Sequence, residues 1–242
     1  MIACALRFYS LGGSEFQGDE AEVTSRSVLL IKAVDDLKNL GVLVVHIHPP
    51  MELVAPIIPI ALLGVNEFAA RLSFALAGVL TVVASYLVAK ELFGEKAGVF
   101  TAFLVACYGP NVMLSRTVQW QIFEALWTTL TALLLAKAIN NQQRQQEFLT
   151  AAAMCFGLAL LTQLDAIFMA PAVAYVIVKL SRGIGLASFL RTSWRAVAVF
   201  AALTIPFYAA YAAAPLVFPE YIPETLGIRY LTTSRSYALN LY

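Results

Sequence analysis

Long apolar runs dominate this sequence and limit the folds that it can adopt. Four of the runs have the roughly 18 or more residues that a helix needs to cross the hydrocarbon core of a bilayer. The runs, separated by short polar breaks, occupy about residues 68–92, 97–114, 118–139, 148–163, 165–180 and 195–214. The fourth and fifth are shorter, which indicates two tilted or partial spans joined by a tight turn. The sequence therefore predicts an all-α, polytopic bundle of transmembrane helices.

The composition agrees with a membrane location and excludes one class of partner. Hydrophobic residues make up 60% of the chain, charged residues 13%, and the mean hydropathy is +0.77, which is far from the values of soluble domains. A net charge of +1 provides no basic surface for nucleic acid. The three cysteines are far apart in apolar stretches, which indicates neither disulfides nor a metal site. We expect a multi-pass protein of the cell membrane.

The residues before the long runs predict a loop that lies on the membrane surface. Residues 1–9 have the length of only the end of a first span, so residues 10–66 form the first loop. Apolar and charged residues are mixed over 19–40, which is typical of an amphipathic helix that lies in the interface. Residues 49–64 are apolar but interrupted by four prolines, which favours a non-spanning segment.

The distribution of charge predicts the orientation. Lys and Arg collect in the breaks near 90–96, 137–147 and 179–195, whereas the first loop is rich in acids. Under the positive-inside rule, the first loop faces away from the cytoplasm. Residues 67–214 then supply about six spans and residues 215–242 begin a second large outer loop. The 242 residues form a single membrane domain, which we expect to be part of a longer protein.

Asp19 and Glu20 are the strongest candidates for chemistry in the first loop. A carboxylate beside an apolar helix at a membrane surface can accept a proton from a hydroxyl nucleophile. The alternative is structural, because Asp19 follows Gly18 at the start of a predicted helix. An acid there caps the helix and complements its dipole. The pattern alone leaves both interpretations open.

Two further groups of polar residues are candidates. His46 and His48 precede two prolines, and they suit a metal site, a phosphate contact or a hydrogen bond to a loop carbonyl. A second group shares one helix face at i, i+4, i+7 and i+11. Its members are Thr117, Gln121, Glu124 and Thr128. This face either lines a polar cavity or forms a hydrogen-bonded seam between helices.

The order of short segments along the chain resembles a known superfamily. These segments are Arg7–Tyr9, Gly18–Glu20, His48–Pro50, Glu67–Leu72, Glu91–Gly98, Gly157–Ala166 and Leu231–Ser234. Together they resemble the lipid-phosphate-sugar-dependent glycosyltransferases of the protein O-mannosyltransferase and aminoarabinose-transferase superfamily, which have the C-type glycosyltransferase fold. The resemblance covers nearly the whole chain.

The resemblance implies an activity and assigns roles to several residues. It implies transfer of a sugar from a polyprenyl or dolichyl phosphate to an acceptor hydroxyl on protein, lipid or glycan outside the cytoplasm, usually with inversion. Asp19 matches the catalytic aspartate of the family, and Glu20 lies beside it. Side chains that stabilise the leaving phosphate are expected among His48, Arg71, Arg116 and, more weakly, Arg229 and Arg235.

The sequence also departs from the family pattern. Many relatives have a second acid at the outer turn after the third span, where Gln121 stands here. Glu124, one turn deeper, is a candidate to replace that second acid, and Gln121 and Glu124 are both candidate substrate contacts. The departure keeps open a non-catalytic membrane subunit, and the polar face over 117–128 keeps open a transporter or flippase-like protein in which it lines a path. No cofactor is predicted, although the first-loop carboxylates leave a divalent cation open.

Overall fold

The structure is a computed structural model that describes residues 1–33 and 51–217, and these residues form helices with no strand among them. The described helices are α1 (Ile2–Phe8), α2 (Asp19–Ala33), α4 (Met51–Val54), α5 (Ile57–Leu63), α6 (Glu67–Phe93), α7 (Glu95–Cys107), α8 (Gly109–Ser115), α9 (Gln121–Asn140), α10 (Gln145–Leu160), the 3-10 helix η2 (Leu164–Met169), α11 (Ala170–Ser181), α12 (Leu186–Thr192) and α13 (Trp194–Val217). The predicted all-α class is confirmed.

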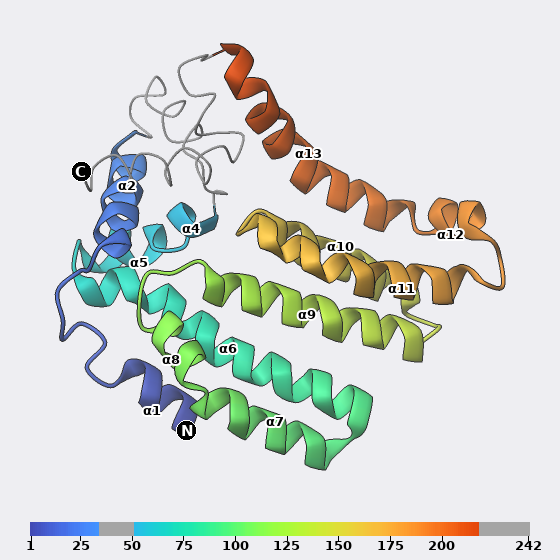
Figure 1. Cartoon of the computed structure of the whole chain (residues 1–242), viewed down its shortest axis with the longest axis horizontal. Helices are drawn as coiled ribbons and strands as arrows, with labels where there is room; N and C mark the ends of the chain where they lie inside the picture. The colour runs from blue at the N-terminus through green and yellow to red at the C-terminus, as the bar shows by residue number, and fades with distance from the viewer. Residues whose placement is uncertain (34–50, 218–242) are drawn as a thin grey trace, which may run out of the picture.

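The long helices pack in sequence order into one bundle. Helix α6 lies against α7 and α9, α9 against α10, and α10 against α13. In Figure 1, α2, α4 and α5 gather at one end of this bundle, beside the N-terminus of α6. The α6–α7 turn, the α9–α10 turn and α12 lie at the opposite end. We call these the α2 end and the α12 end.

The spans are partly continuous and partly bent. By length and composition, α6, α9 and the η2–α11 segment each suffice to cross a membrane. The pairs α7 with α8 and α12 with α13 pass the same test together, but they are bent by 62° and 73°. The described residues thus contain three candidate spans, or up to five if each bent pair is one span. Helix α10 has 16 residues, and the prediction of about six spans stays a prediction.

The bend between α7 and α8 follows from the local sequence and from a buried arginine. Pro110 stands in the first turn of α8, where its missing N–H and fixed φ suit a helix start but not a helix interior. Arg7 is fully buried and donates to the carbonyl oxygens of Val105 and Ala106, 3.5 and 3.2 Å away. These carbonyls belong to the last turn of α7, which has no helical partners for them. Arg7 therefore stabilises the bend.

Helix α6 has clear signals at both ends. Asn66 is its N-cap, and its side-chain oxygen accepts a hydrogen bond from the Ala69 N–H at 2.8 Å. Gly94 ends it with a φ of +91°, which a glycine adopts without steric cost. In the middle, a Cβ on Gly78 would lie 2.4 Å from Ser115 Cβ and 2.7 Å from Arg7 Nε. A glycine at this position is what lets α1 and α8 approach α6.

The first loop agrees with the prediction where it is described. Helix α2 begins at Asp19 and continues to Ala33, and the rest of the predicted 19–40 helix lies outside the described residues. Helices α4 and α5 are short, and neither is a candidate span. An apolar cluster joins α2, α4 and α5 to α6 and α9, so the loop is packed onto the bundle.

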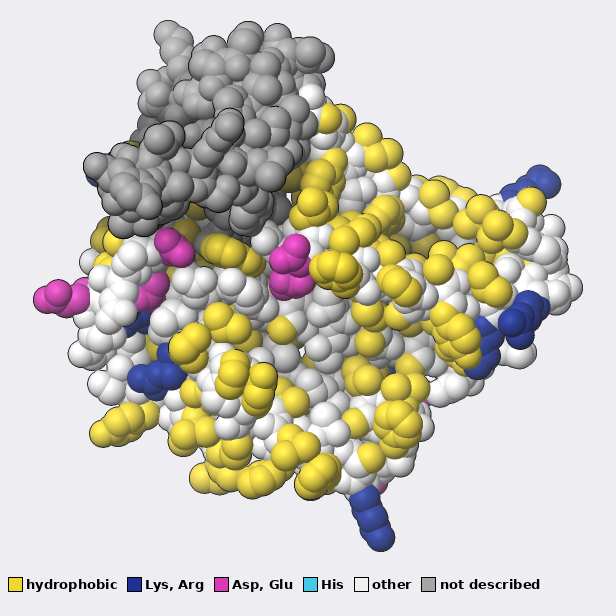
Figure 2. Space-filling model, in the orientation of Figure 1, with side chains coloured by type: hydrophobic (Ala, Val, Ile, Leu, Met, Phe, Trp, Pro, Cys, Tyr) yellow, Lys and Arg dark blue, Asp and Glu magenta, His cyan; other side chains and the backbone are white. Residues whose placement is uncertain are grey.

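Helix α12 (Leu186–Thr192) lies within the segment 179–195, which the sequence predicts to be a polar break. Its apolar residues Leu186, Phe189 and Leu190 stand at i, i+3 and i+4, the spacing of one helix face. On the face drawn in Figure 2, the visible acidic side chains lie mainly at the α2 end, and the α12 end shows mainly Lys and Arg. The two sets of loops that the charge rule assigned to opposite sides thus lie at opposite ends of the bundle. Which side each end faces stays a prediction.

Candidate functional site

A buried ion pair joins the first loop to the bundle. Arg71, on α6, donates from Nε and Nη2 to the two carboxylate oxygens of Glu20, each at 2.9 Å. Both side chains are almost fully buried, with 3% and 4% of their surface exposed. Such a two-point contact between guanidinium and carboxylate fixes orientation as well as distance. The pair therefore sets the position of the first turn of α2 relative to α6.

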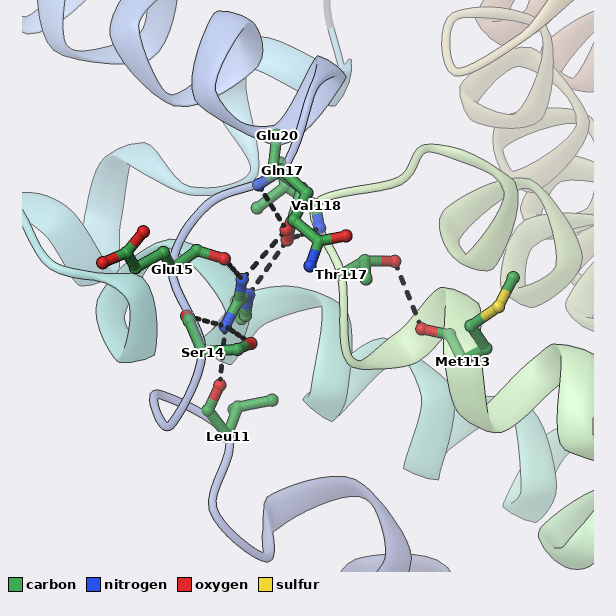
Figure 3. Close-up of polar contacts among 9 residues, drawn as sticks. Leu11, Ser14, Glu15, Gln17, Glu20, Met113, Thr117 and Val118 are labelled. Atoms are coloured by element: carbon green, nitrogen blue, oxygen red, sulfur yellow. Dashed lines mark hydrogen bonds and ion pairs between the residues drawn. The ribbon is translucent and has the colours of Figure 1, made fainter.

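Arg71 also shapes the segment that leads into α2. Its Nη1 donates to the carbonyl oxygens of Leu11 and Ser14, and its Nη2 donates to the carbonyl oxygen of Glu15 (Figure 3). The distances are 3.1, 2.9 and 3.1 Å. Every nitrogen of this guanidinium thus has a protein partner. The sequence suggested Arg71 as a phosphate contact, but its donors are occupied by Glu20 and the loop.

Glu20 extends the same network to the start of α9. Its Oε1 accepts a hydrogen bond from the Val118 backbone N–H at 2.9 Å, and its Oε2 accepts one from the Gln17 N–H at 3.3 Å (Figure 3). Val118 is fully buried and lies in the segment between α8 and α9. One carboxylate therefore ties together α2, α6 and the entrance to α9. This leaves Glu20 without a free oxygen for proton transfer.

Asp19 is placed differently from its neighbour. Asp19 is the first residue of α2 and is exposed. Successive helix residues point about 100° apart around the axis, so Asp19 faces outward where Glu20 faces the bundle. In residues 1–33 and 51–217, no hydrogen bond or ion pair involves its carboxylate. The capping hydrogen bond of the structural interpretation is therefore not formed among these residues. The contacts of Glu20 thus fix the first turn of α2, while the Asp19 side chain that projects from this turn is exposed and has no partner among the described residues.

Arg116 lies at the same end of the bundle, between α8 and α9. Its Nη1 donates to the carbonyl oxygens of Leu6 and Tyr9, at 2.9 and 2.8 Å, and so satisfies the C-terminal end of α1. Nε and Nη2 have no partner within the described part of the chain, and the side chain is half-buried. Arg116 thus has donors available that Arg71 does not.

The first turns of α9 carry the polar face that the sequence predicted. Gln121 and Glu124 are both half-buried there. The side-chain oxygen of Gln121 and the indole N–H of Trp127 are buried without a hydrogen-bond partner among the described residues. The Glu124 carboxylate lies close enough to Asp165 for the two to interact electrostatically. Asp165 is exposed and lies in the first turn of η2.

Other predicted candidates cannot be placed. His46, His48, Arg229 and Arg235 lie outside the described residues. Within the described ranges, no group of three or more side chains of the usual metal-ligating types comes together. The divalent cation stays a prediction that no observation tests. The structure brings together Asp19, Glu20 and Arg71, and through Val118 it links them to the segment before Gln121 and Glu124.

The sequence gives no sign of the part that Val118 plays, because a backbone N–H carries no residue signature. Arg7 enters the sequence-based predictions only through the family resemblance. Its signal was available, because a lone arginine after six apolar or small residues is expensive at membrane depth and requires partners.

Comparisons with known proteins agree with this architecture. The sequence profile of the family described as "Dolichyl-phosphate-mannose-protein mannosyltransferase" matches residues 47–215. None of the curated proteins matches the chain. Among solved structures, the chain is similar to ArnT from Cupriavidus metallidurans in the apo state, with a TM-score of 0.68 and 21% identity over 93% of this chain. ArnT bound to undecaprenyl phosphate gives a TM-score of 0.67 and 21% identity over 92% of this chain.

The two kinds of match support different conclusions. This chain spans 42% and 41% of the two ArnT chains, and at 21% identity the structural likeness shows the fold alone. The profile, in contrast, covers most of the sequence, including α6 to α12 and α13 up to residue 215. It confirms the resemblance that the short segments indicated. The chain belongs to the dolichyl-phosphate-mannose-protein mannosyltransferase family.

Proposed function

We propose that this chain carries the catalytic loop of a membrane glycosyltransferase, which moves a sugar from a lipid-phosphate carrier to an acceptor hydroxyl outside the cytoplasm. Family membership supports the reaction class. It also favours an enzyme over the transporter and the non-catalytic subunit. The structure of an ArnT bound to undecaprenyl phosphate supports a polyprenyl carrier.

The observation that carries the proposal is the contrast between two neighbouring carboxylates. Glu20 is buried and all its hydrogen-bonding capacity is used, whereas Asp19 is exposed at the first position of α2. A general base needs a free oxygen at a defined position. Asp19 meets both conditions, and we assign it the role of base. Glu20 and Arg71 are positioning residues.

The reaction requires charge stabilisation opposite the base. As Asp19 takes the proton of the acceptor hydroxyl, the new bond to the sugar forms and the bond between the sugar and the carrier phosphate breaks. The phosphate leaves with additional negative charge, which a cation with free N–H groups stabilises. Of the predicted arginines in the described residues, Arg116 has such groups and Arg71 does not. We therefore assign the phosphate contact to Arg116.

Gln121 and Glu124 suit the acceptor or sugar side of the site. Both occur in the first turn of α9, directly after the segment that Glu20 holds through Val118. The unpaired Gln121 oxygen accepts hydrogen bonds from a hydroxyl group without needing a charge. The neutral amide of Gln121 in place of an acid is compatible with sugar binding, and it changes which sugar or acceptor the site prefers.

The proposal is tested by sugar transfer in membranes that contain the full-length protein. A radiolabelled polyprenyl-phosphate sugar serves as donor, and wild type is compared with Asp19→Asn at matched expression. Glu22→Gln is the control, because Glu22 is an exposed acid on the same helix. Loss of transfer in Asp19→Asn alone supports the enzyme and the base. Equal transfer by all three proteins would contradict the role of Asp19, and no transfer by any of them would contradict the enzyme.

A further inference from the structure

An apolar cavity lies among five helices, away from the catalytic loop. It has a volume of about 240 Å³, and its lining is almost wholly apolar. The lining residues come from α9, α10, α11, α12 and α13. On α10 the lining extends from Leu149 to Phe156, a length of about 10 Å at the helical rise per residue. The Phe156 and Phe200 rings, which both line the cavity, stack with centroids 5.5 Å apart.

One polar group in this cavity has no partner. Ser193, between α12 and α13, lines the cavity and is 3% exposed. Its hydroxyl is buried and makes no hydrogen bond within the part of the chain that the structure describes. A buried hydroxyl without a partner costs free energy that a bound acceptor restores. The cavity therefore suits a ligand that is mostly hydrocarbon and has an oxygen at one end.

Cations flank the same serine. Arg191 and Arg195 are exposed on either side of it, and neither forms an ion pair with a described residue. Arg195 lies over the ring of Trp194, 5.8 Å from its centroid, and Trp194 is 60% exposed. An exposed tryptophan beside arginines is typical of the level of lipid head groups. Other cations at the α12 end are of both kinds: Lys90 and Arg144 pair with Glu95 and Glu147, whereas Lys96 and Arg182 are exposed without an ion pair among the described residues.

We propose that this cavity is a binding site for an anionic phospholipid. Part of one acyl chain occupies the cavity, an ester oxygen of the lipid accepts the hydrogen bond of Ser193, and the phosphate and head group contact Arg191 and Arg195. Charge complementarity selects an anionic lipid over a zwitterionic one. The site lies at the α12 end, opposite the α2 end that contains Asp19 (Figure 1). The sugar carrier, whose phosphate belongs beside Asp19, is therefore not its occupant.

Native mass spectrometry of the full chain in mild detergent tests this site. The protein is mixed with equal amounts of phosphatidylglycerol and phosphatidylcholine, and the retained lipid is identified. Each cation near a lipid surface contributes about fivefold in affinity, or about 30-fold for two together. We expect wild type to retain phosphatidylglycerol selectively, and Arg191→Gln with Arg195→Gln to abolish this selectivity. Lys96→Gln is the matched control, because Lys96 is an exposed cation on α7, a helix that does not line the cavity.

A second variant tests the cavity itself. Ala153 lines it, and Ala153→Phe fills the space, so retention of phosphatidylglycerol is lost. Ala198→Phe makes the same change on an exposed position of α13 outside the lining and leaves retention unchanged. Equal retention of both lipids by wild type would overturn the proposal. So would an unchanged Ala153→Phe variant, or displacement of phosphatidylglycerol from this site by undecaprenyl phosphate, which would assign the cavity to the carrier.

Discussion

Loss of the ion pair between Glu20 and Arg71 is predicted to destabilise the packing of the first loop on the bundle. In Glu20→Gln, one carboxylate oxygen becomes an NH₂ group. Each Glu20 oxygen accepts hydrogen bonds from one Arg71 nitrogen and one backbone N–H. In either orientation of the amide, its NH₂ group therefore faces two N–H donors and can accept from neither. The same change leaves the guanidinium of Arg71 buried without its counter-charge. Removing one partner of such a pair costs about 3–5 kcal/mol.

Hydrogen exchange at Val118 measures this cost at the place where it arises. The Val118 N–H donates to Glu20 Oε1, so its exchange reports opening of the loop from α9. A loss of 3–5 kcal/mol corresponds to faster exchange by about 10² to 10⁴-fold. The measurement requires the full-length protein in detergent, with peptides or amides that resolve the segment between α8 and α9.

Glu22→Gln is the matched control for this prediction. Glu22 is on the same helix, is 55% exposed on its side chain and pairs with Arg26 one turn later. Exposed pairs of this spacing contribute about 0.3–0.5 kcal/mol, so exchange at Val118 changes by no more than about twofold. If Glu20→Gln accelerates exchange no more than Glu22→Gln, the ion pair does not hold the loop and the reasoning is refuted.

Three further predictions concern the packing around α1, α6 and α8 and the phosphate contact. Gly78→Ala lowers the thermal unfolding temperature, because its Cβ meets Ser115 and Arg7 and overpacking costs about 1–3 kcal/mol. The control Gly109→Ala, whose Cβ meets nothing within 4 Å, is neutral or stabilising. A larger loss in Gly109→Ala than in Gly78→Ala would contradict the close approach of α1 and α8 to α6. Arg7→Lys destabilises by about 1–3 kcal/mol in the same assay, since a single ammonium does not reach both the α7 carbonyls and Asn111; an unchanged midpoint contradicts the bridging role. Arg116→Gln raises KM for the lipid-phosphate donor or lowers kcat in the transfer assay, by about tenfold or more, and unchanged kinetics would remove Arg116 from the site.

The sequence predicted the parts of the fold that depend on local pattern. The runs at 68–92 and 118–139 correspond to α6 and α9 within a few residues, because an uninterrupted apolar stretch in a bilayer has few alternatives to a helix. The run at 97–114 predicts one span, whereas the structure bends after α7, where Gly109 and Pro110 carry the local signal. The polar flanks of residues 186–192 predict a break, whereas these residues form α12 with the i, i+3, i+4 spacing of an amphipathic helix.

The local sequence pattern could not predict how the side chains of the site are arranged. Asp19 and Glu20 are adjacent and chemically alike, and only the packing of α2 decides which one is buried. Glu20 and Arg71 are 51 residues apart, and nothing in either neighbourhood indicates that they pair. Long-range ion pairs of this kind are visible only once helices are placed. The sequence identified the candidates, and the structure shows that Asp19 is exposed while Glu20 is buried against Arg71.

The most direct test of the account is a steady-state comparison of wild type and Asp19→Asn with the lipid-phosphate sugar as the varied substrate. A general base contributes about 10²–10⁴ in rate and little to donor binding, so kcat falls by at least about 100-fold while KM for the donor stays within about threefold. An unchanged kcat, or a rise in KM with kcat preserved, would contradict the assignment of Asp19 as the base.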